Sequence, residues 1–382
     1  MSYPIPVITK INAAQTLGQL YLNMMRSQPT SVGTQPCLLL TMPTAWANKY
    51  QILLYGGAAR HGFAVAGVTT PEDLAHVDWP GPIILHTHWF AALFQGAANP
   101  KEAQMRLDQT KTAILAFKAR TGARVIWTAH NVFPHGNDHP EAYLALRQWI
   151  FETFDALHIM EDDHLAILEQ SYGRSAPHHF TVPHMLYSGS LLTGVDMATA
   201  RTHFGIPHDA TVFGYFGSIQ AYKRISIILD ACDSLPQDCS VRILIGGVPA
   251  DQYEVRRLQA RIGIRRDVIL LPRKIQDHEI QYLHAASDVM VLPYAETLNS
   301  GAAMMSTSFR KPFLTPIGLA AAALTPLGAD LFDGGDPRAL TQAMVGYIQG
   351  TRTPPQINDD AWQARQPALV SDAFFSALKV LS

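Results

Sequence analysis

Apolar runs of strand length alternate with amphipathic segments along most of this chain. Residues 37–41, 83–86 and 123–128 are apolar nearly throughout, which is typical of strands buried on both faces. Between two such runs, residues 101–120 carry apolar side chains at helical spacing. Strands and helices in alternation favour an α/β fold with a mostly parallel, doubly wound sheet. In the first half we expect strands at 6–11, 37–41, 63–66, 83–86, 123–128, 156–160 and 180–182, and helices at 13–25, 101–120, 142–153 and 164–171.

The alternation begins again after residues 187–190, a short stretch with serine and glycine that we interpret as a linker. The pattern therefore predicts two Rossmann-like domains, residues 1–187 and 188–360, followed by a C-terminal helix at 361–382. Ligands of such sheets bind beyond the carboxyl ends of the strands, and two facing halves leave a cleft between them. In the second half we expect strands at 211–216, 241–245, 268–271, 289–292 and 312–314, and helices at 225–232, 252–262, 277–285, 337–348 and 361–381, besides one that opens at 299–301.

Composition narrows the class of protein. The chain has 382 residues and a formal net charge of −2, which suits two domains and argues against a dedicated nucleic-acid binder. Its three scattered cysteines form no CxxC pair, so neither a disulfide framework nor a zinc site is indicated. The N-terminus lacks a signal-peptide pattern, and no apolar run of about 18 residues occurs. We expect a cytoplasmic protein, with peripheral membrane contact left open.

Residues 288–305 are the stretch around which the second half is organised. The apolar run 289–292 ends at Pro293, which cannot donate to a ladder, and a new helix opens at Asn299, Ser300 and Gly301. The first turn of a helix has free N–H groups and attracts phosphate, and glycine permits close approach to the backbone. An ordinary helix cap is the alternative interpretation of the same residues.

A second loop follows the predicted strand at 211–216. Gly217 permits a tight turn there, and Lys223 lies where an ammonium can reach back toward a phosphate. Because both loops follow strands of one predicted sheet, we expect a diphosphate to meet free amides and an ammonium together. Neither GxGxxG nor GxxxxGK[ST] occurs here, which disfavours a dehydrogenase or a P-loop NTPase.

Histidines follow several predicted strands of the first half. His86 and His88 end one strand, His130 and His135 end another, and His184 follows a third. Imidazoles at such an edge can bond sugar hydroxyls or shuttle protons near neutral pH. The acidic run at 161–163 precedes a predicted helix, where acids are more often caps than metal ligands, so we expect no metal site.

These motifs together resemble a known family. The second half resembles the C-terminal domain of GT-B nucleotide-sugar glycosyltransferases, and the first half resembles their bacterial exopolysaccharide branch, in particular the β-mannosyltransferases of xanthan-gum assembly. The resemblance implies a GT-B fold, in which two Rossmann-like domains face each other across a cleft and the C-terminal helix returns to the N-terminal domain. The motifs that carry it are Gly217-(x5)-Lys223, Leu292-Pro293-Tyr294, Asn299-Ser300-Gly301, the segment 308–312, His86-Thr87-His88-Trp89, and Thr128-Ala129-His130-Asn131-(x2)-Pro134-His135.

The resemblance also implies roles for single residues. Residues 1–187 would bind the acceptor and 188–360 the nucleotide-sugar donor. His130 would face the transferred sugar, and His86, His88 and His184 would contact the acceptor or the sugar. The expected donor-binding residues are Gly217, Ser218, Lys223, Arg273, Lys274, Ile275, Glu296, Asn299, Ser300 and Gly301.

The chain departs from the family pattern at three points. Ser218 stands where many relatives carry arginine, so one phosphate charge is missing. Met304 stands where the EX7E motif of retaining enzymes has its second glutamate, which weakens the retaining interpretation. Gly136 and Asn137 precede Asp138, whereas acidic residues follow the Pro-His pair directly in the xanthan enzymes.

The resulting hypothesis is an inverting, metal-independent transfer of mannose from GDP-mannose to a lipid-diphosphate-linked oligosaccharide, with a β product and no cofactor. The catalytic base stays open among His130, His135 and Asp138. Such an acceptor implies contact with the anionic cytoplasmic face of the inner membrane, for which the basic helix 101–120 is a candidate, although a solvated helix face is the commoner case. The alternatives are a retaining enzyme that uses a UDP-sugar, a nucleotide-sugar 2-epimerase, and a non-catalytic nucleotide-sugar-binding protein.

Overall fold

The computed structural model divides the chain into two compact units, Met1–Met185 with Pro367–Ser382 (unit 1) and Leu186–Gln366 (unit 2). The sequence pattern put the boundary at residue 187 and set a last helix at 361–382 apart. The structure describes residues 5–27, 35–45, 48–134, 136, 138–236, 239–294 and 297–381.

Unit 1 is built on a parallel sheet. Within its described residues the sheet has six strands in the order β2-β1-β3-β4-β5-β6. Strands β1 and β3 are buried along their whole length, as expected of central strands covered on both faces. The strands are β1 (Cys37–Met42), β2 (Phe63–Gly67), β3 (Ile83–Thr87), β4 (Arg124–Thr128), β5 (Ala156–Ile159) and β6 (His178–Thr181).

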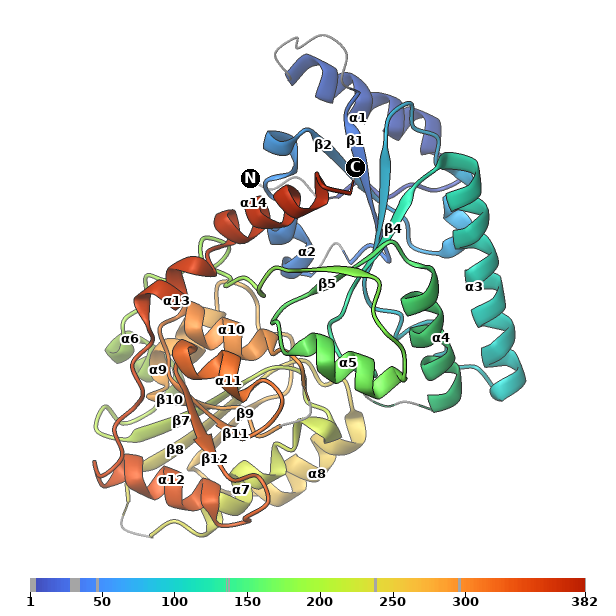
Figure 1. Cartoon of the computed structure of the whole chain (residues 1–382). Helices are drawn as coiled ribbons and strands as arrows, with labels where there is room; N and C mark the ends of the chain where they lie inside the picture. Colours follow the sequence, from blue (N-terminus) through green and yellow to red (C-terminus); the bar gives the residue numbers. More distant parts are fainter. Residues whose placement is uncertain are drawn as a thin grey trace. The chain divides into compact units, whose positions relative to one another are not determined.

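Helices pack on this sheet, and the last helix of the chain is one of them. Figure 1 shows α14 in red beside α2 in blue. The Oγ of Ser371 on α14 donates to the Leu54 carbonyl at 2.6 Å and accepts from the Gly57 amide at 2.8 Å, while Phe374 and Phe375 are fully buried in the unit 1 core. The helices are α1 (Ala13–Ser27), α2 (Lys49–Leu54), η1 (Ala58–His61), η2 (Pro71–His76), α3 (Pro100–Thr121), α4 (Pro140–Thr153), α5 (His164–Tyr172) and α14 (Pro367–Leu378).

Unit 2 repeats the same plan. Its described residues form a parallel sheet of six strands in the order β12-β11-β10-β7-β8-β9. The predicted alternation of strand and helix, and hence the α/β class, is confirmed in both units. The strands are β7 (Thr211–Phe216), β8 (Val241–Gly246), β9 (Val268–Leu271), β10 (Val289–Val291), β11 (Phe313–Pro316) and β12 (Ala329–Phe332).

The helices of unit 2 are short, and several are single turns. The longest is α8, whose bounds match the predicted 252–262. They are α6 (Met197–Phe204), η3 (Ala221–Lys223), α7 (Ser226–Asp233), α8 (Gln252–Ile262), α9 (Ile280–Ala286), α10 (Gly301–Ser308), α11 (Ala321–Leu324), η4 (Thr325–Leu327), α12 (Ala339–Ile348) and α13 (Asp359–Ala364).

Two sequence predictions about elements are wrong. Residues 6–11 form no strand, since their only ladder contact is an isolated bridge between Val7 and Gly67. The single helix predicted at 361–381 is two helices, α13 and α14, because Pro367 cannot donate an N–H and disfavours helical backbone before it. Each of these two helices lies in a different unit.

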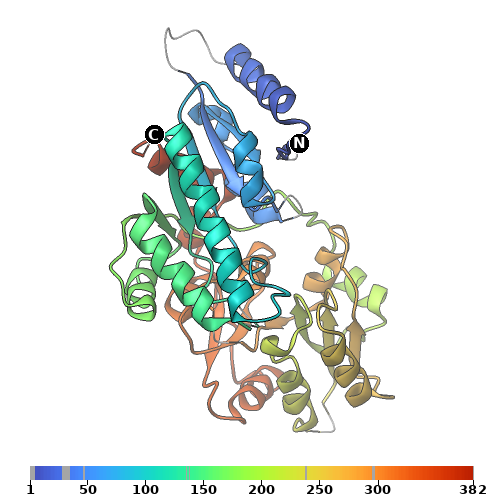
Figure 2. The same cartoon turned by 90° about the vertical axis from the view of Figure 1, so that its right-hand side faces the viewer.

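Three basic side chains of helix α3, the predicted basic helix, have partners within unit 1. Figure 2 shows α3 in teal running beside α4 in green. Lys118 pairs with Asp155 at 2.8 Å, Arg106 pairs with Glu102 at 2.6 Å, and Arg120 donates to two backbone carbonyls. These contacts favour a packed structural helix over a membrane-binding face. No helix among the residues that the structure describes is long and apolar enough to span a bilayer.

Candidate functional site

The loops after β7, β8, β9 and β10 meet at one edge of the unit 2 sheet. These strands are parallel neighbours, so their carboxyl ends lie side by side, where ligands of such sheets bind. All the expected donor-binding residues follow three of these strands. One of them, Glu296, lies outside the described residues, so its role in donor binding stays a prediction.

The β7 and β8 loops approach each other more closely than side chains would allow. The Gly217 amide donates to the Gly246 carbonyl at 3.1 Å. A Cβ added to Gly247 would lie 1.6 Å from the Gly217 carbonyl oxygen, which is a direct overlap. Glycine at position 247 therefore fixes how close the two loops lie. On the β7 loop, the Ser218 Oγ accepts from the side-chain amide of Gln220 at 2.8 Å.

Lys223 places a positive charge against the aromatic side chains of this edge. Its Nζ lies 3.6 Å from the centre of the Tyr294 ring and 4.9 Å from that of Tyr222. Burial lowers the pKa of Lys223 to about 8. A lysine held over aromatic rings, with a pKa depressed by desolvation, is stabilised by an approaching anion.

Tyr294 connects this lysine with the start of α10. The Tyr294 hydroxyl lies 2.9 Å from the Ser300 Oγ, and that oxygen accepts from the Ala303 amide at 3.1 Å as the helix N-cap. Gly301 opens the helix, and a Cβ added there would lie 3.1 Å from the Tyr187 hydroxyl. An ammonium and a capped helix N-terminus thus share one tyrosine.

The remaining predicted donor residues lie around this centre. Asn299 is half-buried, and its carbonyl accepts from the Thr297 hydroxyl. Arg273 and Lys274 are exposed after β9, and Arg273 forms a two-bond ion pair with Glu279 at 2.7 and 2.8 Å. Ile275 is buried and lies against Gly246. In this segment the exposed side chains of Arg273 and Lys274 are therefore the groups that remain accessible to a donor.

The carboxyl edge of the unit 1 sheet holds a buried hydrogen-bonded network in place of charge. His86 is fully buried, with Nδ1 2.9 Å from the Tyr55 hydroxyl and Nε2 2.6 Å from the Thr128 hydroxyl. His88, 1% exposed, lies between Tyr55 at 2.5 Å and His130 at 3.1 Å. Because both ring nitrogens of each histidine are engaged, the structure argues against the predicted direct sugar contact by His86 and His88.

His130 is the next group of this network after His88, and it is 7% exposed. The Trp89 ring stacks on it at 4.2 Å, and the Tyr50 ring meets it edge-on at 5.0 Å. Burial, followed by the neighbouring His88, His184, His158 and Arg147, holds the pKa of His130 well below its ordinary value. The ring is therefore neutral near pH 7, as a proton acceptor must be.

The other first-half candidates differ in setting. Asp138 is exposed, and His135 lies outside the described residues. His184 is buried, and its Nδ1 donates to the Met185 carbonyl at 2.8 Å, so Nδ1 carries a proton. Among the three candidate bases, the structure thus describes His130 as the one held in a defined orientation.

Sequence reasoning missed Tyr55 and His158, which complete the network. His158 lies in β5, with Nδ1 2.9 Å from Thr128 Oγ1 and Nε2 2.8 Å from the Val182 carbonyl oxygen. Tyr55 follows α2, a helix of six residues, which is too short for a periodic pattern to predict it. A histidine inside an apolar strand, as at position 158, was the available signal.

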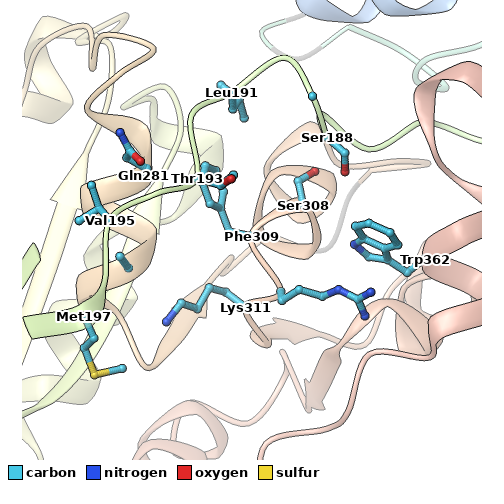
Figure 3. A pocket seen from close by; sticks show the side chains of 13 residues that line it. Ser188, Leu191, Thr193, Val195, Met197, Gln281, Ser308, Phe309, Lys311 and Trp362 are labelled. Carbon is cyan, nitrogen blue, oxygen red and sulfur yellow. The ribbon is translucent and has the colours of Figure 1, made fainter.

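A separate hollow of about 500 Å³ lies in unit 2. Figure 3 shows Trp362 on one side of it, Val195 and Met197 on the other, and Phe309 and Lys311 between them. Two of its polar side chains already have partners within unit 2: Lys311 donates to the Ser287 carbonyl at 2.7 Å, and Gln281 accepts from the Gly194 amide at 2.9 Å. We interpret this hollow as a structural groove. In the part of the chain that the structure describes, no group of three His, Cys, Asp or Glu residues is arranged to hold a metal ion.

Comparison with known proteins identifies the family that this chain resembles. Residues 196–299 match the family Glycosyl transferases group 1, a segment that contains the β7 loop and Lys223. The chain is 30% identical over 222 residues to the D-inositol 3-phosphate glycosyltransferase of Corynebacterium urealyticum, covering 54% of this chain and 52% of the relative. It is 24% identical over 304 residues to the GDP-mannose:glycolipid 4-beta-D-mannosyltransferase of Xanthomonas campestris pv. campestris, covering 73% and 76%.

Solved structures extend the likeness to nearly the whole chain. HepE of Anabaena in complex with UDP matches with a TM-score of 0.65 at 15% identity, covering 90% of this chain and all of that one. Sucrose-phosphate synthase of Thermosynechococcus elongatus matches with a TM-score of 0.63 at 16% identity, covering 90% and 95%. These likenesses confirm the predicted fold, although the chain spans only about half the length of its inositol-phosphate relative. The chain therefore has the GT-B fold, and its residues 196–299 match the family Glycosyl transferases group 1.

Proposed function

We propose that this chain is a glycosyltransferase that moves a sugar from a nucleoside diphosphate sugar to a hydroxyl group of an acceptor. One observation carries the proposal: the ammonium of Lys223 lies over Tyr294, whose hydroxyl bonds the Ser300 cap of α10. A cation and a helix N-terminus suit a diphosphate, which is the anionic part of such a donor. The matched family and the UDP complex of HepE support the same class of ligand.

The proposed reaction is an inverting displacement. The acceptor oxygen forms a bond to the anomeric carbon, while the bond from that carbon to the β-phosphate oxygen breaks and its electron pair leaves with the phosphate. The acceptor proton passes to a base, for which His130 is our first choice because its ring is neutral and held in place. Lys223 and the α10 amides stabilise the charge that grows on the phosphate, so they act most strongly in the transition state.

For the substrates we propose GDP-mannose and a lipid-diphosphate-linked oligosaccharide of exopolysaccharide assembly, with a β product. The Xanthomonas relative, a GDP-mannose:glycolipid 4-beta-D-mannosyltransferase that matches 73% of this chain, supports this choice. Met304, in place of the second glutamate of retaining enzymes, supports inversion. With such an acceptor the enzyme would work peripherally at the cytoplasmic face of a membrane.

A retaining enzyme that uses a UDP-sugar is the second candidate. The inositol-phosphate glycosyltransferase relative is similar at 30% identity, and HepE of Anabaena was solved with UDP-glucose as well as UDP. A retaining transfer needs no side-chain base. In that case substitution of His130 would change turnover much less.

The test is a transfer assay with GDP-mannose, UDP-glucose and ADP-glucose against lipid-diphosphate oligosaccharide acceptors. We expect release of nucleotide only when an acceptor is present, and an inverted anomeric configuration of the product by NMR. Release without an acceptor would point to a hydrolase or an epimerase, and a retained configuration would favour the second candidate. Binding of donors without turnover on any acceptor would favour a non-catalytic binding protein.

A further inference from the structure

The buried network of unit 1 is a continuous line of hydrogen bonds that ends at a backbone carbonyl. From Val182 O it runs through His158, Thr128, His86, Tyr55 and His88 to His130, with separations of 2.8, 2.9, 2.6, 2.9, 2.5 and 3.1 Å between successive groups. Every side chain between the two ends has two neighbours in the line. Such a line can have a direction, because each link holds one proton.

The Val182 carbonyl sets the direction at one end. A carbonyl oxygen can only accept, so His158 Nε2, 2.8 Å away, carries a proton and donates. In a neutral ring His158 Nδ1 is then the acceptor of the hydrogen bond that the Thr128 hydroxyl donates. Because the Thr128 hydroxyl donates its hydrogen bond to His158, its oxygen accepts a hydrogen bond from His86 Nε2.

The direction continues through Tyr55. His86 Nδ1 now lacks a proton, so it accepts from the Tyr55 hydroxyl at 2.9 Å. Thr41 Oγ1, at 3.2 Å, is the competing partner for that proton, but donation there would leave the bare His86 nitrogen facing an oxygen lone pair. Because the Tyr55 hydroxyl donates to His86, its oxygen accepts a hydrogen bond from His88 Nε2 at 2.5 Å.

The line then reaches His130. Since His88 Nε2 carries the proton of that ring, His88 Nδ1 accepts, and its neighbour at 3.1 Å, His130 Nε2, donates. In a neutral His130 the lone pair consequently belongs to Nδ1. The reverse direction would require a bare His158 nitrogen 2.8 Å from the Val182 oxygen, which is repulsive.

We propose that the Val182 carbonyl, acting through His158, Thr128, His86, Tyr55 and His88, holds His130 in the Nε2–H tautomer, so that Nδ1 is the nitrogen that accepts the acceptor's proton. The inference rests on the proposed glycosyl transfer for its chemical use, although the tautomer itself does not depend on activity. Tyr55, His86, His88 and His158 are positioning residues, because they act through His130. The low pKa values of His86, His88, His130 and His158, caused first by burial, agree with four neutral rings.

The chemical step balances in this arrangement. As the acceptor oxygen bonds the anomeric carbon, its proton moves to His130 Nδ1, and the sugar–phosphate bond breaks with its electron pair on the phosphate oxygen. His130 becomes an imidazolium that still donates through Nε2 to His88, so no hydrogen bond of the line has to reverse. With the opposite tautomer Nδ1 would already hold a proton and could not take another.

The direct test is ¹⁵N NMR of the histidine-labelled full chain, with the His130 signals assigned by their loss in His130→Gln. Imidazole ¹⁵N shifts distinguish the two neutral tautomers. We expect a protonated Nε2 and a bare Nδ1 on His130 in the wild type. A protonated Nδ1, or an even mixture, would overturn the proposal, whatever the activity.

The second test is Tyr55→Phe, with Tyr143→Phe as its matched control. Without the Tyr55 oxygen, His88 Nε2 has no acceptor, so the preference reverses; we expect a fall in kcat of about tenfold or more, with the donor KM within about twofold, and a shift of the His130 signals toward a protonated Nδ1. Tyr143 donates to the Ala91 carbonyl at 2.7 Å and lies outside the line, so its variant should change neither readout. Unchanged His130 signals in Tyr55→Phe would contradict the inference. Absence of transfer by the wild type on all donors would count against the proposed function alone.

Discussion

Both sheets are parallel throughout their described strands, but their carboxyl edges differ in electrostatic character. The described part of each unit has six parallel strands, with loops at the carboxyl end that carry the candidate residues. At the unit 2 edge the central group is the ammonium of Lys223 beside the N-terminus of α10. At the unit 1 edge the central groups are imidazoles whose pKa values are lowered by burial, so they are neutral.

The difference shows that the fold provides the position, while the side chains at the strand ends and in the loops provide the chemistry. A positive edge suits an anion and can stabilise charge that grows on a leaving group. A neutral, directed network suits a hydroxyl group, since it can take a proton without first repelling one. Substitutions and pH changes that act on one of these edges should therefore have effects that differ from those at the other.

The largest effect is expected from Lys223→Ala. Removing one preorganised donor from a developing oxyanion costs on the order of 10²-fold or more in kcat. Because Lys223 is half-buried at the surface, we expect its removal to change the stability of the fold little. Nucleotide binding should weaken as well. Arg256→Ala, on the exposed face of α8 in the same unit, is the control and should retain activity. Near-normal turnover of Lys223→Ala would remove this residue from the site.

Gly247→Ala tests the close contact of the β7 and β8 loops. The new Cβ would overlap the Gly217 carbonyl, so the loops must move apart, and we expect a loss of about 2 kcal/mol in the free energy of unfolding, together with weaker nucleotide binding. Gly194→Ala is the control, because no atom lies within 4 Å of its added Cβ. Urea denaturation and calorimetric binding measure both effects. Equal behaviour of the two variants would show that the loops adapt without cost.

Mild acid should weaken unit 1 before unit 2. Folding lowers the pKa of His86, His88, His130 and His158, so as pH falls below 6.5 the unfolded chain binds protons that the folded chain does not, and the free energy of unfolding drops. Each such histidine lowers the free energy of unfolding by about 1.4 kcal/mol per pH unit below pH 6.5, until the pH reaches its folded pKa. Above pH 6.5 this loss does not occur, so the full stability is present. In unit 2 the corresponding described histidine is His284, with a pKa lowered to about 4 by burial.

Urea titration at pH 7 and pH 5.5 with peptide-resolved hydrogen exchange measures this difference between units. The carboxylates whose pKa folding lowers, such as Asp267 and Glu279 with values of about 2, lose their contribution at lower pH and do not interfere. We expect the midpoint of unit 1 peptides to fall further than that of unit 2 peptides. Equal shifts in both units would contradict the assignment of neutral histidines to unit 1.

The smallest effect is expected from Ser300→Ala. The variant loses the N-cap of α10 and the bond to Tyr294, and a lost cap costs about 1 kcal/mol of stability. Asn358→Ala removes a comparable cap from α13 and should cost a similar amount. Only Ser300→Ala should also weaken nucleotide binding. A loss of binding in both variants would mean that stability alone explains the effect.

The fold was predictable because long apolar runs and helical spacing are local properties of the sequence. The bounds of β7, α8 and β9 agree with the predicted ranges. Short elements escaped prediction: α2, α6 and β12 have too few residues to show a period. The break at Pro367 and the absence of a strand at 6–11 depend on tertiary packing and on one proline.

The candidate site was predictable in unit 2 and only partly in unit 1. Lys223, Ser300 and Gly301 lie in or just after the loops that follow β7 and β10, neighbouring strands of one sheet, so topology brings them to one edge. The hydrogen-bonded line of unit 1 needs Tyr55, from a short helix end, and His158, from inside a strand. Contacts between residues so far apart in sequence depend on side-chain orientation, which residue types and spacing do not specify.

The most direct test of the central claim is calorimetric binding of GDP, UDP and ADP to the wild type and to Lys223→Ala, at pH 8 in two buffers of different ionisation enthalpy. Because the pKa of Lys223 is lowered to about 8, a bound diphosphate raises it and the protein takes up a proton, so the measured enthalpy should depend on the buffer. We predict tighter binding of one nucleotide, GDP for the mannose hypothesis, with a buffer dependence that is lost in Lys223→Ala. Absence of binding, or binding that Lys223→Ala leaves unchanged, would contradict a donor site at this edge.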